Sequence, residues 1–139
     1  MKLLCETDFV AKNEEFRELA RDLAMHVAAM SPRYISFEKA DKEEIAEFER
    51  SIREEISAEP ARNASRGDSE WHSDTGGKKP VEIVEKIVSG KVKKHFHEIS
   101  LLSQPYVKNP DMTVQDLLTE KISKIGENIQ IVDFARFEV

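Results

Sequence analysis

The residues best suited to chemistry in this chain do not have the spacing of a catalytic or metal site. His95 and His97 could offer imidazole ligands, but a two-residue step along a helix points them about 200° apart. Cys5 and His26 lie far from that pair and from each other, so no zinc-binding spacing emerges. We therefore expect no metal site and no cofactor.

A second group has the residue types of a hydrolase triad: Asp68, Ser69, His72, Ser73 and Asp74. The surrounding stretch is rich in glycine and serine, whereas catalytic groups need support from rigid elements. We interpret these side chains as solvated loop residues, and we expect a protein that is not an enzyme and has no catalytic residues. The competing hypothesis, a hydrolase or metalloenzyme, predicts activity that is lost in His72→Ala or on chelation.

The charge balance limits the class of partner. The 139 residues include 21 Lys and Arg against 27 Asp and Glu, which gives a net charge of −6. Proteins that bind nucleic-acid phosphates normally display a basic surface, so we expect no direct nucleic-acid binding. No apolar run approaches the length of a membrane span, and Cys5 as the single cysteine forms no internal disulfide. These features favour a cytoplasmic protein, or an organellar-matrix protein after removal of a presequence, with no membrane partner.

Periodic apolar residues predict the helices that must position any site. Residues 14–30 form the clearest amphipathic helix, which Ser31-Pro32 should end because proline disfavours a helical residue before it. A second stripe predicts a helix over 41–57. Residues 58–79 lose all periodicity and predict a long exposed loop.

The second half of the chain predicts further helices and the main strand. A helix should begin at Pro80 and break at Gly90, with a second short helix following at a changed angle. Residues 101–107 should be extended and end at Asn109-Pro110-Asp111. The last predicted helix covers 114–125. It is capped by Thr113, with Asp116 closing a capping box, and is stopped by Gly126.

The strand signals complete the predicted fold class. Residues 128–139 are apolar on both faces in the middle and predict a paired strand, whose only good partner in the chain is the segment 1–5. We predict one domain, 1–139, of class α+β: helix-rich, with about five helices packed with a small antiparallel sheet. A two-stranded sheet is marginal alone, so helices must cover it or another chain must complete it.

The segment Thr7-Asp8-Phe9-Val10 allows two interpretations. Thr7 or Asp8 could cap a helix while a hydrophobic residue folds back onto the first turn. Alternatively, Phe9 could project from the body as a peg. His26 also allows two interpretations. It could be a half-buried histidine that hydrogen-bonds to the backbone, or it could contact a partner from a helix face of small residues.

Several blocks of the chain together resemble translation elongation factor Ts, specifically its short bacterial form. They run in the family's order from end to end: Cys5–Asn13, Asp22–Met30, Glu85–Gly90, Leu101–Lys108, Lys124–Ile129 and Phe134–Val139. The resemblance implies a guanine-nucleotide exchange factor that binds elongation factor Tu·GDP and promotes GDP release. It implies that Phe9 wedges near the magnesium and phosphate site of that GTPase, that Thr7, Asp8 and Val10 hold or extend the wedge, and that His26 is a second contact.

The departures from the family pattern leave a second hypothesis open. The family normally carries an N-terminal module resembling a ubiquitin-associated domain, and we expect a core (dimerisation) domain without it. The alternative function is therefore a structural dimerisation or binding module that keeps the fold but has lost exchange activity. Short-form members pair as homodimers, in some cases through a cysteine in the last strand. Ala135 stands at that position, so a noncovalent homodimer remains open while a disulfide-linked one is not expected.

Overall fold

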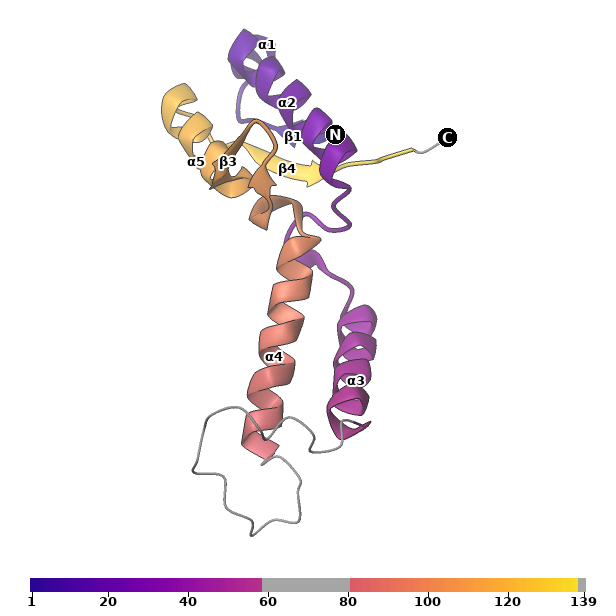
Figure 1. The fold of residues 1–139 in the computed structure, drawn as a ribbon. Coiled ribbons are helices and arrows are strands. Elements are labelled where there is room, and N and C mark those ends of the chain that lie inside the picture. Colours follow the sequence, from indigo (N-terminus) through magenta and orange to yellow (C-terminus); the bar gives the residue numbers. More distant parts are fainter. Residues whose placement is uncertain (59–80, 138–139) are drawn as a thin grey trace. The chain divides into compact units, whose positions relative to one another are not determined.

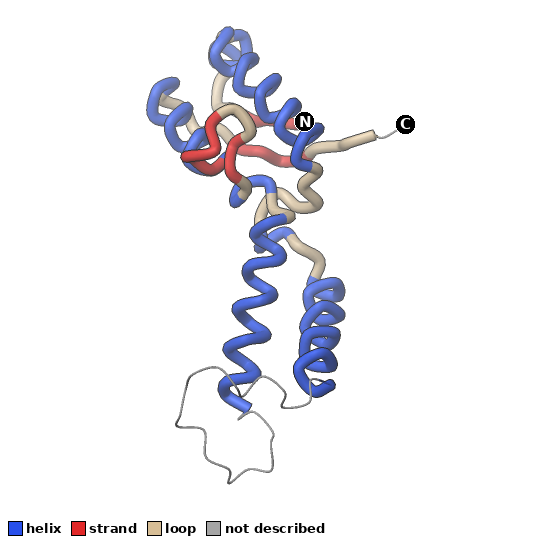
Figure 2. Tube along the Cα trace, in the orientation of Figure 1, coloured by secondary structure: helices blue, strands red, loops and turns tan. Residues whose placement is uncertain are grey.

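The computed structural model describes residues 1–58 and 81–137, which fall into two compact units. Unit 1 joins the two ends of the chain, Met1–Ala40 and Phe96–Val139, and unit 2 is the intervening Asp41–His95 (Figure 1). The described residues form five α-helices and four short strands, which confirms the predicted α+β class. Figure 2 shows helices in both units, whereas the strands of the described chain occur in unit 1.

Some predictions fall on residues outside this description. The predicted loop at 58–79 lies there except for Ala58, the last residue of a helix, and so does the hydrolase-like group at 68–74. That the whole chain acts as one core domain stays a prediction. None of the described helices is both long and apolar enough to cross a membrane.

Helix α2 (Glu14–Met30) builds the core of unit 1 with the bounds predicted from its periodicity. Asn13 caps its first turn, and Ser31 ends it in the left-handed conformation with φ 51°. Its buried stripe packs with buried residues from the rest of unit 1 into one cluster: Val10, Phe16, Leu19, Leu23, Val27, Leu101, Tyr106, Val114, Leu117, Leu118 and Ile129. Helix α2 therefore joins the first and last thirds of the chain through a single core.

Helix α5 (Val114–Ile125) also confirms its predicted caps. The Thr113 side chain accepts a hydrogen bond from the backbone N–H of Asp116, and the Asp116 carboxylate accepts one from the backbone N–H of Thr113. The helix ends at Gly126, whose φ of 82° is the left-handed conformation that favours glycine. The residue after it, Glu127, leaves the helix in a direction set by this turn.

The two ends of the chain pair as predicted. Strand β1 (Lys2–Leu4) and strand β4 (Gln130–Asp133) are antiparallel, with Leu3 opposite Ile131. The predicted length of the last strand was wrong, since residues 134–137 are not in a strand and 138–139 lie outside the description. Strand β1 has only three residues, so β4 has no further partner in the described chain along which to extend.

The prediction for residues 101–111 was also wrong in part. Leu101–Ser103 form a 3-10 turn (η2) rather than extended chain, and β2 (Pro105–Tyr106) then pairs with β3 (Asn109–Thr113) in a hairpin. The turn falls at residues 107–108. The Asn109-Pro110-Asp111 segment therefore belongs to a strand, and proline is tolerated there because the two-stranded hairpin leaves an open edge.

Unit 2 consists of helix α3 (Lys42–Ala58) and the part of α4 (Val81–Glu98) up to His95. Arg53 binds both oxygens of the Glu85 carboxylate, Lys91 pairs with Glu55 at 3.2 Å, and the His95 ring stacks on Phe48. Those contacts join the two helices as an antiparallel pair. Before α3, the 3-10 turn η1 (Phe37–Lys39) belongs to unit 1.

The predicted break at Gly90 was wrong, because α4 runs without interruption from Val81 to Glu98. A glycine inside a helix costs about 1 kcal/mol relative to alanine. Val88, Val92 and Phe96 continue one buried stripe across Gly90 at four-residue spacing. Burying each such side chain contributes about 1.5–3 kcal/mol, so packing outweighs the local preference of the glycine.

Candidate partner-binding site

The segment expected to form the site folds as a separate five-residue helix, α1 (Asp8–Lys12), ahead of α2. Thr7 is its N-cap, in an extended conformation, and its hydroxyl accepts a hydrogen bond from the N–H of Val10 at 3.4 Å. The capping interpretation is thus confirmed for Thr7. The sequence did not predict this helix as an element of its own, because no apolar period can be recognised over five residues.

Phe9 and Val10 point to opposite environments from adjacent positions of α1. Val10 is 8% exposed and belongs to the core cluster, whereas Phe9 is 81% exposed. Neighbouring side chains on a helix diverge by about 100°, so anchoring Val10 in the core turns Phe9 outward. The hydrophobic residue that folds back is therefore Val10, and Phe9 projects as a peg.

Asn13 fixes the angle between α1 and α2. Its backbone N–H donates to the carbonyl of Val10 at 2.9 Å, and its side-chain oxygen accepts from the N–H of Glu15 at 2.9 Å. It thus serves as the C-cap of α1 and the N-cap of α2, in one extended conformation. Because Asn13 is the one residue between α1 and α2 and is hydrogen-bonded to both, Phe9 has a defined direction relative to the core.

The charged neighbours of Phe9 remain in solvent. Lys12 pairs with Asp8 at 3.1 Å across one helical turn, with side chains 71% and 69% exposed. Such an exposed pair contributes little to stability, because water screens it and both side chains lose rotamer freedom. Both groups therefore keep their charge accessible beside the peg.

A carboxylate that the sequence analysis did not single out holds the start of α1. Glu127 accepts the backbone N–H of Thr7 on one oxygen at 3.0 Å and the Thr7 hydroxyl on the other at 2.6 Å. The two residues are 120 positions apart. No local pattern could reveal this contact; the only hint in the sequence is that Val10, rather than an acid, stands three residues after Thr7.

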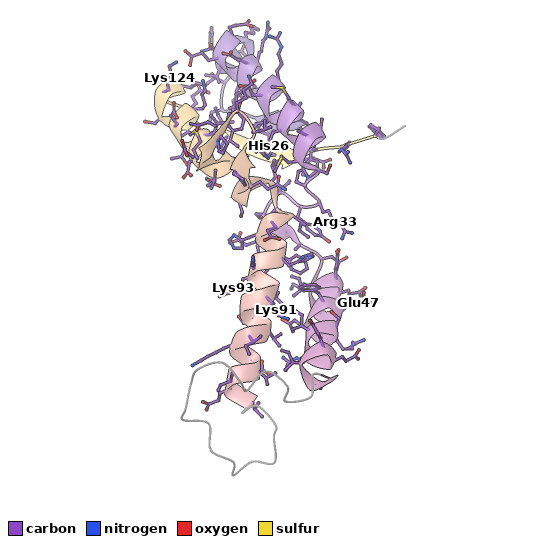
Figure 3. All side chains as sticks on the ribbon, in the orientation of Figure 1. His26, Arg33, Glu47, Lys91, Lys93 and Lys124 are labelled. Atoms are coloured by element: carbon purple, nitrogen blue, oxygen red, sulfur yellow. The ribbon has the colours of Figure 1, made fainter. Side chains whose placement is uncertain are left out.

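His26 lies on α2, towards the end of the helix that is away from α1 (Figure 3). Its side chain is fully buried, at 0% exposure. Its Nε2 is 3.0 Å from the side-chain oxygen of Gln104, and its Nδ1 accepts the backbone N–H of Val107 at 3.2 Å. This arrangement needs the neutral ring with its proton on Nε2. Burial lowers the pKa of His26, against the opposing effect of the Gln104 hydrogen bond. The ring holds the β2–β3 hairpin, and its role as a partner contact stays a prediction.

Asp22 ties the same hairpin to α2. Its carboxylate accepts hydrogen bonds from the Tyr106 hydroxyl at 2.9 Å and the Lys108 ammonium at 2.6 Å. Burial alone would raise the pKa of Asp22, but the bonds from Lys108 and Tyr106 together lower it. Burial and this carboxylate in turn raise the pKa of Tyr106. The hairpin is therefore fixed by two separate polar contacts on successive turns of α2.

The described residues contain no group of three or more His, Cys, Asp and Glu side chains placed to hold a metal ion. His95 and His97 serve instead as aromatic partners, since His95 stacks on Phe48 and His97 on Phe37. Cys5 is a partly buried free thiol whose Sγ lies 3.3 Å from the carbonyl oxygen of Thr7. What the arrangement offers chemically is an exposed aromatic side chain on a rigid mount.

Comparison with known proteins identifies the family of this chain. A family model described as Elongation factor TS matches residues 17–139. The chain belongs to the elongation factor Ts family. It is 44% identical over 139 residues to elongation factor Ts of Thermodesulfovibrio yellowstonii, covering 60% of that protein, and 47% identical to that of Carboxydothermus hydrogenoformans, covering 56%.

The family relationship confirms the resemblance noted in the sequence. Both relatives align with the whole of this chain, so the alignments include the peg, which the family model does not cover. The elongation factor Ts of Alkaliphilus oremlandii is 48% identical over 134 residues. The chain spans 54–60% of the length of these three relatives.

Proposed function

We propose that this chain acts in translation, in the cytoplasm, as a guanine-nucleotide exchange factor that binds elongation factor Tu·GDP and inserts Phe9 near the magnesium and phosphate site. The observation that carries the proposal is the outward Phe9 on a helix fixed at both ends. An exposed aromatic on a rigid mount loses little conformational freedom when it binds. Asp8 and Lys12 flank it with accessible charge.

The proposed action follows from reciprocal coupling. An exchange protein that prefers the nucleotide-free GTPase lowers the affinity of the GTPase for GDP. Bound GDP lowers the affinity of the GTPase for the exchange protein by the same ratio. Burying a phenylalanine contributes on the order of 1.5–3 kcal/mol. If the peg and its neighbours couple by about 4 kcal/mol, the affinity for GDP falls roughly a thousandfold. Phe9 would then supply about half of that coupling.

The test is release of fluorescent GDP from purified elongation factor Tu. We expect the parent chain to accelerate release and Phe9→Ala to lower that acceleration at least tenfold. Phe137→Ala is the matched control, because Phe137 is also a phenylalanine, is 91% exposed and lies outside α1. Equal acceleration by parent and Phe9→Ala refutes Phe9 as the wedge. No acceleration by a folded parent refutes exchange activity.

A second candidate function is a dimerisation module without exchange activity. It is favoured by apolar side chains left exposed on the β1–β4 sheet, namely Leu4 at 47% and Val132 at 40%. A two-stranded sheet is marginal without cover, and in this hypothesis a second copy of the chain covers it. Sedimentation of the parent and of Val132→Asp distinguishes the cases. A dimer lost in the variant supports pairing through this sheet, and a monomeric parent refutes it.

A further inference from the structure

The short helix that carries the peg lacks half of its own cap. In a capping box, the N-cap side chain accepts the N–H of the third helical residue, and the side chain of that residue accepts the N–H of the N-cap. Thr7 makes the first bond to Val10. Val10 cannot make the second, because it is apolar and occupied in the core. The N-cap N–H of α1 therefore needs an acceptor from elsewhere.

Helix α5 shows the complete arrangement within the same protein. Its Thr113 accepts the N–H of Asp116 at 3.1 Å, and Asp116 accepts the Thr113 N–H at 2.9 Å and hydroxyl at 2.7 Å. At α1 the corresponding bonds to Glu127 are 3.0 Å and 2.6 Å. Glu127 thus accepts from Thr7 the bonds that Asp116 accepts from Thr113, although Glu127 lies 120 residues from Thr7 in the sequence.

The position of Glu127 is set independently of α1. It follows Gly126, whose left-handed conformation ends α5 through a hydrogen bond from its N–H to the Ile122 carbonyl at 2.8 Å. Ile122 and Ile125 pack against the core cluster, so the end of α5 is anchored by contacts other than its bonds to Thr7. Glu127 is partly buried as a residue, and its carboxylate presents both oxygens to Thr7. It is therefore a fixed point for the start of α1.

We propose that Glu127 is a positioning residue for Phe9: by completing the cap of α1 it holds the peg in its outward direction. The inference rests on the proposed exchange function. Val10 and Asn13 secure the inner face and the end of α1. The first turn, where Phe9 lies, is otherwise held by bonds within the segment itself, from the N–H groups of Val10 and Ala11 to Thr7. Without Glu127 the first turn is free to unwind while Val10 stays in the core. The peg would then sample many directions, and binding would have to select the productive one.

The test compares Glu127→Gln with Asp116→Asn as the matched control. Each change removes the negative charge that strengthens the hydrogen bonds of one cap. In Glu127→Gln the NH₂ group must also face one of the two Thr7 donors, because those donors bind different oxygens. Both Thr113 donors bind the same oxygen of Asp116, so Asp116→Asn weakens its cap through the lost charge. In amide hydrogen exchange we expect protection at Val10 and Ala11 to fall about fivefold in Glu127→Gln, the size typical of a lost cap. The amides of α5 should change only in Asp116→Asn. Unchanged protection of α1 in Glu127→Gln overturns the inference.

Nucleotide release then separates positioning from general stability. Glu127→Gln should raise the concentration for half-maximal GDP release about fivefold and leave the maximal rate near that of the parent, whereas Asp116→Asn should change neither. Equal effects of Glu127→Gln and Asp116→Asn overturn the positioning role. A parent that does not accelerate release refutes the exchange function instead, and hydrogen exchange still decides whether Glu127 holds α1.

Discussion

The opposite environments of Phe9 and Val10 predict opposite consequences of the same truncation. Val10→Ala removes two methyl groups from a side chain that is 8% exposed in the core. At about 0.8 kcal/mol for each buried carbon, plus a contribution from the cavity, the free energy of unfolding should fall by about 2 kcal/mol. Phe9→Ala acts on a side chain that is 81% exposed, so stability should stay within about 0.5 kcal/mol.

Urea denaturation followed by circular dichroism measures both changes. With a denaturant dependence of about 2 kcal/mol per molar urea, the midpoint should fall by about 1 M in Val10→Ala and by no more than about 0.25 M in Phe9→Ala. A loss above about 1 kcal/mol in Phe9→Ala would mean that the ring packs on the body and is not a free peg. An unchanged midpoint in Val10→Ala would show that α1 is not anchored through this residue.

Further predictions concern the two glycines in the described part of the chain, the buried histidine and the hairpin. Gly90→Ala should raise the thermal midpoint, by about 1 kcal/mol in stability, because the new methyl meets no atom within 4 Å. Gly126→Ala should lower the midpoint similarly, because φ is 82° there; a shift of the same sign in both variants would contradict the backbone argument. Since burial lowers the pKa of His26, the unfolded chain binds more protons below about pH 6.5, so stability should fall with acidification, by at most about 1.4 kcal/mol per pH unit for this group. The urea midpoint should therefore depend less on pH in His26→Asn, and an equal dependence would exclude His26 as the cause. Tyr106→Phe should cost about 1 kcal/mol through its lost bond to Asp22, and a neutral result would mean that this bond adds nothing.

Local sequence signals predicted the elements that are defined locally. Helix α5 was predicted with its bounds and both caps, because Thr113, Asp116 and Gly126 act within a few residues of one another. The pairing of β1 with β4 was predicted by elimination, since few segments were suitable strands. The prediction of a helix break at Gly90 was wrong because it considered only the low helix propensity of glycine. The buried apolar residues on both sides of Gly90 stabilise the continuous helix.

The parts that could not be predicted depend on contacts between distant residues. His26 could be read as buried or as a surface contact, because Gln104 and Val107, its hydrogen-bond partners, lie 78 and 81 residues away. The burial of Val10 against the exposure of Phe9 was equally undetermined, since both are apolar and adjacent. Only the assembled core decides which of the two faces inward.

The peg of this chain is consequently a product of the whole of unit 1 rather than of its own segment. A five-residue helix is far too short to be stable alone, because nucleation costs more than its few hydrogen bonds return. Its inner face needs the core that α2 and α5 build together, and its first turn needs Glu127. A peptide containing only residues 1–40 would keep Thr7, Phe9 and Asn13 but lose β4 and that carboxylate. The direction of Phe9 is therefore set by residues near both ends of the chain, which meet only once unit 1 has folded.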